Sequence, residues 1–259
     1  MTEAILQIKD LSVDFRVESG KSHAVKGVSF EINPGETLAI VGESGSGKSV
    51  TALSILQLLP YSSASHPSGS ILYRGQELMG ADEATLQHAR GNNISMIFQE
   101  PMTALNPLHV VEHQIGEVLS LHKNLNAAQA RTRILELLLL VGIREPEKRL
   151  NAYPHQLSGG QQQRVMIAMA LANEPEILIA DEPTTALDVT IQAQILELMK
   201  ELTKNLGVSM IIITHNLGVV ARYADRVNVM YAGKIIETGT AQDIYHNPQH
   251  PYTLALLNS

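Results

Sequence analysis

The stretch that decides the fold is Thr37-Leu38-Ala39-Ile40-Val41-Gly42-Glu43-Ser44-Gly45-Ser46-Gly47-Lys48-Ser49. Its first five residues form a short apolar run, which is typical of a buried strand. The next eight match the pattern G-x-x-x-x-G-K-[S/T], in which glycines let backbone N–H groups curl around phosphate oxygens. A helical pattern with Leu53, Leu56 and Leu59 follows. Strand, loop and helix in this order predict a phosphate-binding loop in an α/β fold.

The polar residues of this loop suit a nucleotide with its magnesium ion. Lys48 carries a positive charge for the β- and γ-phosphates, and the Ser49 hydroxyl is a Mg²⁺ ligand. We expect ATP to contact the loop and the start of the helix, that is Gly42, Glu43, Ser44, Gly45, Ser46, Gly47, Lys48, Ser49 and Val50. Taken alone, the motif indicates an NTPase or a kinase, and a chance glycine- and serine-rich turn is the alternative.

Two acids end another apolar run. Ile177-Leu178-Ile179-Ala180 leads directly into Asp181-Glu182. Because ligands lie at the carboxyl ends of parallel strands, we expect Asp181 to hold Mg²⁺. Glu182 would then act as general base or polarise the attacking water. A surface acid pair before a proline is the alternative, and the phosphate loop elsewhere in the chain favours catalysis.

Composition excludes several classes of function. The net charge is −7, from 26 acidic and 19 basic residues, so a general nucleic-acid surface is not expected. Without cysteine, neither a disulfide framework nor a cysteine-ligated metal site can form. The first ten residues lack the pattern of a signal peptide. Apolar runs such as Leu137–Val141 are far shorter than the ~20 residues of a membrane span. These features predict a cytosolic chain that reaches a membrane through partners.

The pattern along the chain predicts a mostly parallel sheet covered by helices. Two N-terminal strands, Ile5–Val17 and Ala24–Ile32, read as antiparallel, and Pro60–Gly69 reads as a loop. Further strands are expected at 71–75, 94–99, 177–180, 210–214, 227–231 and 234–237, and a helix at 159–171. We expect one domain over 1–259, with its core in 1–99 and 158–240, a helical subdomain in 100–157 and a tail in 241–259.

A second anion-binding segment narrows the family. Leu157-Ser158-Gly159-Gly160-Gln161 places a serine and two glycines at the start of a helix, where backbone N–H groups are available to an anion. With the phosphate loop and the Asp181-Glu182 pair, this segment resembles the ABC ATPase family. The resemblance covers nearly the whole chain, and its motifs come in the family's order. It implies a P-loop core of ABC type, an N-terminal antiparallel β subdomain and an inserted α-helical subdomain.

The resemblance assigns a role to each matching position. Phe15 resembles the aromatic residue that stacks on adenine, Gln99 the glutamine that senses Mg²⁺, and His215 the histidine that contacts the γ-phosphate. Ala186-Leu187-Asp188 resembles the loop at the dimer interface. The family's signature acts on the nucleotide of a facing subunit, which gives this in-trans role to Ser158, Gly159, Gly160 and Gln161. The implied catalytic set is Glu182, His215, Gln99 and Lys48, and the implied Mg²⁺ ligands are Ser49, Gln99 and Asp181.

Two further segments resemble the ATPases of oligopeptide, dipeptide and nickel importers. They are Gln99-Glu100-Pro101-Met102-Thr103-Ala104-Leu105-Asn106-Pro107 and Asn247-Pro248-Gln249-His250-Pro251-Tyr252-Thr253. Single ATPases of that group continue into a cysteine-bearing segment that is not found here. The resemblance therefore implies the N-terminal half of a subunit with two fused ATPase units, or a fragment.

The resemblance also implies partners and a location. The partners are a second ABC ATPase unit (a copy of this chain or a fused half), membrane permease subunits and a periplasmic or extracellular substrate-binding protein. The chain would lie on the cytoplasmic side of the inner membrane, held there by the permease, and would energise uptake of peptides or peptide-like compounds.

Three alternatives remain open. A soluble ABC ATPase of DNA repair or translation would use the same residues, although the segment between Ser49 and Leu157 is too short for a long coiled coil and the chain is acidic. A P-loop small-molecule kinase would explain residues 42–49 but not 157–161. A non-hydrolysing regulatory half conflicts with the presence of Glu182 and His215.

Overall fold

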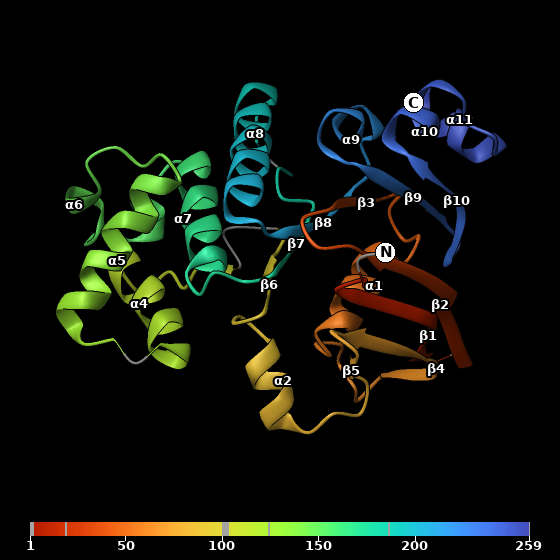
Figure 1. The fold of residues 1–259 in the computed structure, drawn as a ribbon, viewed down its shortest axis with the longest axis horizontal. Coiled ribbons are helices and arrows are strands. Elements are labelled where there is room, and N and C mark those ends of the chain that lie inside the picture. The colour runs from red at the N-terminus through yellow and green to blue at the C-terminus, as the bar shows by residue number, and fades with distance from the viewer. Residues whose placement is uncertain (1–2, 19, 100–103, 124, 186, 259) are drawn as a thin grey trace. The chain divides into compact units, whose positions relative to one another are not determined.

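The computed structural model describes residues 3–18, 20–99, 104–123, 125–185 and 187–258. They form two compact units (Figure 1). Unit 1 contains residues 1–87 and 209–259, and unit 2 contains residues 88–208. The chain therefore starts unit 1, builds unit 2 and returns to complete unit 1. The short helix α2 (Glu83–Ala89) carries the chain from the first unit into the second.

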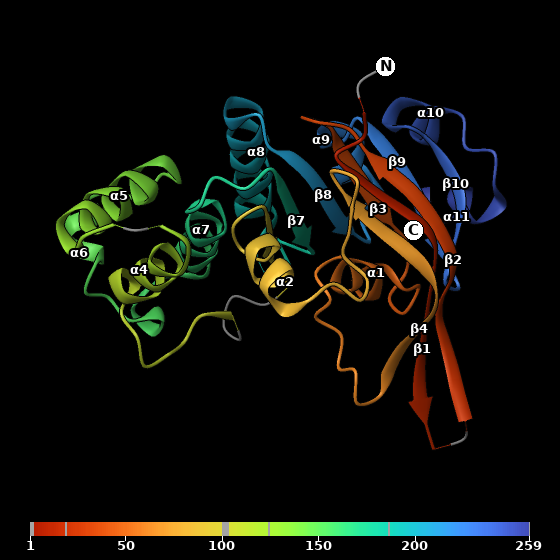
Figure 2. The ribbon, with the colours of Figure 1, turned by 60° about the horizontal axis from the view of Figure 1, so that its bottom comes forward.

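An antiparallel sheet opens unit 1. Its order is β2-β1-β4-β5, from β1 (Leu6–Val17), β2 (Gly20–Ile32), β4 (Ala64–Tyr73) and β5 (Gln76–Glu77). Leu6 lies opposite Ile32 on one side and Tyr73 on the other. The long strands β1, β2 and β4 run beside one another in Figure 2. The predicted pair of N-terminal antiparallel strands is confirmed.

The prediction of a loop over Pro60–Gly69 is wrong in its second half, because β4 begins at Ala64. Ser68 Oγ donates to the Asp10 carbonyl at 3.0 Å and to Ser12 Oγ at 3.1 Å, so small hydroxyl side chains join β4 to β1. Serine and glycine favour turns when they stand alone. Here a neighbouring strand offers partners for both backbone and side chains, and pairing overrides the local preference.

Four strands of unit 1 belong to a mixed sheet, in the order β10-β9-β3-β8. They are β3 (Thr37–Val41), β8 (Ser209–Thr214), β9 (Arg226–Tyr231) and β10 (Lys234–Thr240). β3 pairs in parallel with β8 and β9, and every residue of β3 and β8 is buried. The predicted strands at 227–231 and 234–237 are β9 and β10, and they form a hairpin in which Ala232 and Gly233 both have positive φ, at 48° and 84°. Two positive φ angles are typical of the type I′ turn.

Short helices complete unit 1. They are α1 (Lys48–Ile55), α9 (Leu217–Tyr223), α10 (Ala241–His246) and α11 (Pro251–Leu257). The helix after the phosphate loop ends at Ile55, so the predicted stripe continues past its end at Leu56 and Leu59, which are nevertheless buried.

Unit 2 combines two parallel strands with a group of helices. β6 (Ile94–Ile97) pairs with β7 (Ile177–Asp181), with Ile94 opposite Ile177. The helices are α4 (Val111–His122), α5 (Ala127–Leu140), α6 (Pro146–Arg149), the 3₁₀ turn η1 (Pro154–Gln156), α7 (Gly159–Leu171) and α8 (Val189–Leu206). The predicted helix at 159–171 is confirmed. Ile134, Leu137, Leu138 and Val141, which follow one another at helical spacing, are buried.

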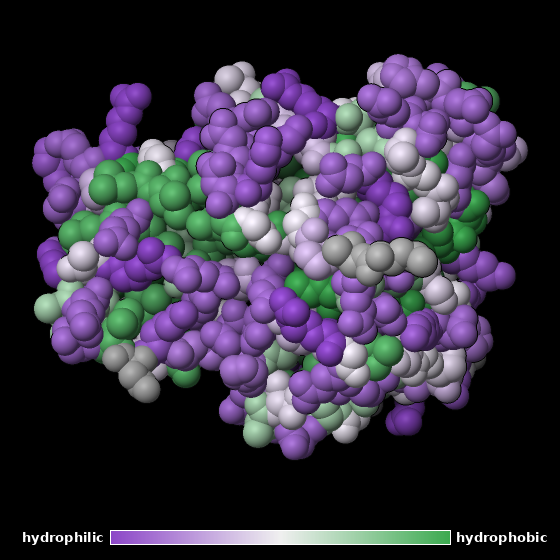
Figure 3. Space-filling view, viewed as in Figure 1, coloured by the Kyte–Doolittle hydropathy of each residue, from purple (hydrophilic) through white to green (hydrophobic). Residues whose placement is uncertain are grey.

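The surface is mostly hydrophilic in the view of Figure 3, and apolar residues gather over the helices of unit 2 at the left. Large exposed apolar side chains of this unit are Leu108, Leu121, Leu139 and Val189, among others. Within the described ranges, the helices are too short or too polar for any of them to cross a bilayer.

Candidate nucleotide site

The phosphate loop joins β3 to α1 in unit 1, and two of its glycines have no room for a side chain. A Cβ on Gly42 would lie 2.1 Å from the Met230 carbonyl oxygen. A Cβ on Gly47 would lie 2.6 Å from the Ala24 carbonyl oxygen and 2.9 Å from Met230 Cε. Gly47 also has φ +102°, a conformation that other residues rarely adopt. The motif therefore needs glycine here for close backbone approach as well as for phosphate.

Lys48 lies inside this loop. Its side chain is only 4% exposed, and Nζ donates to the carbonyl oxygens of Gly42 and Glu43 at 2.8 Å each. Ser46 N donates to the Glu43 carbonyl at 3.2 Å, and Gly233 N donates to the Ser46 carbonyl at 3.0 Å. The loop is therefore a compact turn around an ammonium group. Because the ammonium group is buried within the loop and also lies 3.5 Å from the Ser46 hydroxyl, its positive charge is positioned to meet an anion at this loop.

His215 leaves the sheet beside the loop. Val41 and Thr214 pair across β3 and β8, so residues 42 and 215 follow neighbouring strand ends. His215 is exposed, while Asn216 N donates to Thr214 Oγ1 at 3.1 Å and turns the chain after the strand. The sheet thus places Lys48 and His215 at one edge of unit 1, which is where an α/β sheet presents ligands.

The predicted acids lie together in unit 2. Asp181 is 6% exposed at the end of β7. The backbone of Glu182 has φ +45°, an uncommon value for a residue other than glycine. Glu182 Oε2 accepts hydrogen bonds from Thr185 Oγ1 at 2.9 Å and from Gln99 Nε2 at 3.4 Å. Backbone strain of this type clusters at functional sites. The structure brings together Gln99 and Glu182 from distant parts of the sequence, with Thr185 as a third member.

The signature segment begins α7. Ser158 is its N-cap, with Gln161 N donating to Ser158 Oγ at 3.3 Å and Ser158 N donating to Gln161 Oε1 at 3.1 Å, which is a capping box. A Cβ on Gly160 would lie 3.0 Å from Ile191 Cγ2 and one on Gly159 would lie 3.3 Å from Leu187 Cδ2. The two glycines therefore let α7 approach the start of α8 closely.

Other predicted residues have identifiable structural surroundings. Asp188 is exposed and caps α8 by accepting from Ile191 N at 3.0 Å. Phe15 is half-buried in β1, opposite Ser22 and Ala64. Ser49 and Val50 are half-buried in the first turn of α1, whereas Glu43 and Ser44 are exposed. Ala186 and the segment 100–103 lie outside the described residues.

The predicted site residues are divided between the two units. Phe15, the loop 42–50 and His215 belong to unit 1, whereas Gln99, Asp181, Glu182, the signature 158–161 and Asp188 belong to unit 2. Of the predicted Mg²⁺ ligands, Ser49 belongs to unit 1, and Gln99 and Asp181 belong to unit 2.

Sequence reasoning missed three contributors to these sites. Thr185 supports Glu182, Met230 closes the loop around Gly42 and Gly47, and the Tyr252 hydroxyl accepts from Glu43 N at 2.9 Å. Thr185 stands three residues after Glu182, which is a usual spacing for a side-chain hydrogen bond in a turn. No local pattern could have indicated the contacts of Met230 and Tyr252, because their partners are distant in sequence.

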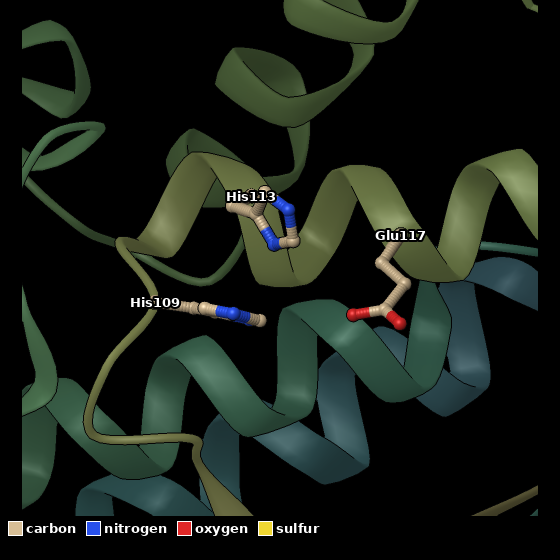
Figure 4. A group of neighbouring side chains, drawn as sticks. All are labelled: His109, His113 and Glu117. Carbon is tan, nitrogen blue, oxygen red and sulfur yellow. The ribbon is translucent and has the colours of Figure 1, made fainter.

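A separate group of potential metal ligands lies on α4 and on the turn that precedes it. His109, His113 and Glu117 place their ligand atoms within 4.8 Å of one another, and Figure 4 shows the three side chains on the same side of the helix. This group belongs to the helical part of unit 2 and takes no part in the contacts of Glu182 described above.

Comparison with known proteins identifies the family. The ABC transporter family model matches residues 25–185. The peptidoglycan transport ATP-binding protein YejF of Agrobacterium fabrum is 63% identical over 99% of this chain and 47% of its own length. The oligopeptide transport ATP-binding protein OppD of Bacillus subtilis is 56% identical over 98% of this chain and 71% of its own length. This chain thus spans less than half the length of the first relative.

Solved structures agree with the fold. A dimeric, post-hydrolysis structure of the ATP-binding cassette MJ0796 with ADP and Pi superposes with a TM-score of 0.81, at 30% identity over 91% of this chain and 98% of the cassette. CbiO1 of Clostridium perfringens, part of the transporter complex CbiONQ, gives a TM-score of 0.79 at 30% identity over 95% of this chain and 92% of its own. The predicted P-loop core of ABC type, with its antiparallel and helical additions, is confirmed. The chain belongs to the ABC transporter family.

Proposed function

We propose that this chain binds and hydrolyses MgATP as the motor unit of an ABC transporter that takes up peptides or peptide-like compounds. The observation that carries the proposal is the environment of Glu182, which follows a buried aspartate and accepts hydrogen bonds from Gln99 and Thr185. A small-molecule kinase would explain the phosphate loop, but it would leave the arrangement of Glu182 with Gln99 and Thr185 without a role.

The chemistry would be in-line attack of water on the γ-phosphate, for which the protein supplies position and charge. Lys48 neutralises the phosphates and His215 steadies the γ-phosphate. Glu182 takes a proton from the attacking water or polarises it, since its carboxylate is held by Gln99 and Thr185 and the residue is only half-buried. Phe15 would stack on the adenine ring.

Magnesium suits the donor atoms of the predicted ligands. Ser49 offers a hydroxyl, Gln99 an amide oxygen and Asp181 a buried carboxylate, and such hard oxygen donors are those that Mg²⁺ prefers. When bound, the ion neutralises charge on the β- and γ-phosphates. Asp181 fits this role because its carboxylate stands at the carboxyl end of the buried strand β7, which is where a parallel sheet presents groups to a ligand.

The signature would serve a second ABC unit. The Ser158 side chain accepts from Gln161 N, so the amides of Gly159 and Gly160, in the first turn of α7, have no partner within the helix. These amides and the helix dipole form an anion site for the γ-phosphate held by a facing loop. Asp188, exposed at the start of α8, would lie at the same interface.

The transport role rests on the relatives. The two relatives described above are named as peptidoglycan and oligopeptide transport ATP-binding proteins, and the C-terminal segment 247–253 resembles that group. We place the chain on the cytoplasmic face of the inner membrane, bound to permease subunits that work with a substrate-binding protein. The helical subdomain, residues 100–157, would contact the permease, and its exposed Leu108 and Leu121 support that assignment.

The test is the variant Glu182→Gln, with Glu201→Gln on α8 as the matched control. We expect Glu182→Gln to bind MgATP as the wild type does while phosphate release falls by at least ~100-fold, the scale of general base catalysis. Glu201 is exposed and remote from this arrangement in the sequence, so its variant should hydrolyse ATP normally. Wild-type phosphate release from Glu182→Gln would refute the assignment.

A further inference from the structure

The C-terminal segment 247–253 reaches the phosphate loop. Tyr252, in the first turn of α11, accepts a hydrogen bond at its hydroxyl from Glu43 N at 2.9 Å. The positions are 209 residues apart. Burial raises the pKa of the Tyr252 hydroxyl, so it stays protonated and neutral at physiological pH. The predicted function gives this contact no role.

The contact fixes one end of a peptide unit whose other end is held by Lys48. The Gly42 carbonyl and the Glu43 N–H belong to the same planar peptide group. Lys48 Nζ donates to that carbonyl at 2.8 Å, and Tyr252 accepts from that N–H. Gly42 has φ +154° and lacks a Cβ, so rotation of this peptide group meets little local resistance. Two opposed hydrogen bonds therefore define its orientation.

Tyr252 is itself held in place by the tail. Glu237 on β10 accepts from the amides of Gln249 at 2.6 Å and His250 at 3.1 Å. His250 Nδ1 then accepts from Tyr252 N at 3.1 Å, which caps α11. The Tyr252 ring packs on Tyr231, with ring centroids 4.4 Å apart. The tail thus presents the hydroxyl to the loop on a constrained support.

We propose that Tyr252 is a positioning residue that keeps the Gly42–Glu43 peptide oriented when Lys48 turns toward phosphate. The inference rests on the proposed nucleotide binding. When Lys48 Nζ donates to a phosphate oxygen instead of the Gly42 carbonyl, of these two contacts only the hydrogen bond from Glu43 N to the Tyr252 hydroxyl still holds this peptide group. Without it the loop would sample other peptide orientations, and the bound arrangement would be populated less often.

The test is Tyr252→Phe, which removes the hydroxyl and keeps the ring. Loss of one hydrogen bond predicts a roughly threefold to tenfold rise in the KM and Kd for MgATP, with kcat unchanged. Tyr231→Phe is the matched control, because it removes a neighbouring hydroxyl for which no loop contact is seen among the described residues. Amide hydrogen exchange in the absence of nucleotide should also be faster at Glu43 in Tyr252→Phe.

The outcomes separate this inference from the proposed function. Absence of MgATP binding by the wild type would reject the proposed function, while exchange at Glu43 would still report on the contact. If the wild type binds and Tyr252→Phe binds equally well, or if exchange at Glu43 is unchanged, Tyr252 does not position the loop. A change in Tm alone, with unchanged KM, would also overturn the proposal, because it would mark a merely structural residue.

A second inference comes from the group of potential metal ligands His109, His113 and Glu117. His113 and Glu117 lie on this helix one turn apart, and His109 precedes it, so all three share one face (Figure 4). The rings of His109 and His113 have centroids 4.2 Å apart. The positive charge of the nearby Arg131 is paired with Glu112, which reduces its repulsion of a metal ion at this group.

The turn that carries His109 is anchored to α4. Gln114 is 4% exposed, and its Nε2 donates to the carbonyl oxygens of His109 at 2.8 Å and Asn106 at 3.2 Å. Its Oε1 accepts from Asn106 N at 2.9 Å. One buried amide therefore fixes the backbone of His109 against the helix, so that only the side-chain torsions of the three residues need to adjust around an ion.

The geometry points to a surface site for a borderline transition-metal ion such as Zn²⁺ at His109, His113 and Glu117. Two imidazoles and a carboxylate are a usual zinc donor set, and a fourth position would be taken by water. In zinc titration by calorimetry with Mg²⁺ in excess, the wild type should bind one Zn²⁺ that His113→Ala does not. His155→Ala, which removes an exposed histidine elsewhere in unit 2, should bind as the wild type does. Equal zinc binding by wild type and His113→Ala would overturn the assignment.

Discussion

At the scale of single residues, Gly47 shows how steric room and backbone angle act together. Both Gly45 and Gly47 have positive φ, at 79° and 102°. An added Cβ at Gly45 meets no atom within 4 Å, whereas at Gly47 it meets backbone at 2.6 Å. The backbone penalty of a left-handed angle, about 1–2 kcal/mol, applies to both positions, but overpacking of about 1–3 kcal/mol applies to Gly47 alone.

We therefore expect Gly47→Ala to lower the midpoint temperature of thermal unfolding clearly more than Gly45→Ala does. The shift should come with loss of MgATP binding, because relief of the clash with Ala24 requires the loop to move. Calorimetric unfolding of the two purified variants checks the difference. Equal stability of the two would mean that the loop absorbs the extra methyl group elsewhere.

Glu237 gives a prediction about acid stability. Burial opposes its charged form, but hydrogen bonds from the amides of Gln249 and His250 outweigh burial, and the pKa of Glu237 lies below its usual value. A carboxyl whose pKa is lower in the folded state stabilises that state above its unfolded pKa, and this contribution is lost as the pH falls through the folded pKa.

We accordingly expect Glu237→Gln to be less stable than the wild type at neutral pH and equal to it well below pH ~4, where the wild-type carboxyl is protonated. Urea unfolding, followed by tyrosine fluorescence at several pH values, would measure the difference in the free energy of unfolding between the variant and the wild type. The matched control is Glu31→Gln on β2, because Glu31 is exposed. Asp243→Asn would be less suitable, because Asp243 accepts a hydrogen bond from the Thr240 hydroxyl that caps α10. A stability difference that did not vary with pH would contradict the role assigned to the charge.

At the scale of elements, the start of α7 carries two opposing requirements. Alanine is favoured over glycine within a helix by up to about 1 kcal/mol. A Cβ on Gly160 would however lie 3.0 Å from Ile191 Cγ2, which is tighter than most such contacts. Packing against Ile191 of α8 therefore favours glycine over alanine at position 160, independently of any anion that the amides at the start of α7 bind.

Gly160→Ala should destabilise the wild type but stabilise, or leave unchanged, a chain that already carries Ile191→Ala. The sign reversal follows because the truncated Ile191 removes the contact and leaves only the helix preference. A double-mutant cycle of unfolding free energies measures the coupling. Additive effects in the two backgrounds would show that α7 and α8 adjust independently.

Local patterns allowed the strands and α7 to be predicted, because β3, β7 and β8 are uninterrupted apolar runs and Ser158 with Gln161 is a recognisable cap. The polar strand β4 was missed because its stability depends on bonds to β1. The same limit applies to the site. Gln99 was assigned to Mg²⁺ from the resemblance, and its hydrogen bond to Glu182 needed the fold.

At the scale of the whole molecule, the proposed pairing of two units predicts complementation between inactive variants. Lys48→Ala damages the phosphate loop, and Ser158→Arg damages the signature that would complete the site of a facing unit. In a mixed pair, one nucleotide site combines both defects, while the other combines the intact loop of one chain with the intact signature of its partner. Either variant alone contains a defect in every site of its homodimer.

We therefore expect each variant alone to be nearly inactive in phosphate release, and a mixture of the two to recover activity that rises with total protein concentration. Ser158 is exposed, so its replacement should cost no more than about 1–2 kcal/mol through loss of the cap and leave the chain folded. As a control, a mixture of Lys48→Ala with Glu182→Gln should stay inactive, because both lesions affect the chain that holds the nucleotide and every mixed site retains one of them. Recovery in the first mixture alone would place the signature in trans. An inactive first mixture, with both variants folded and the wild type active, would mean that this chain completes its site with a different second unit.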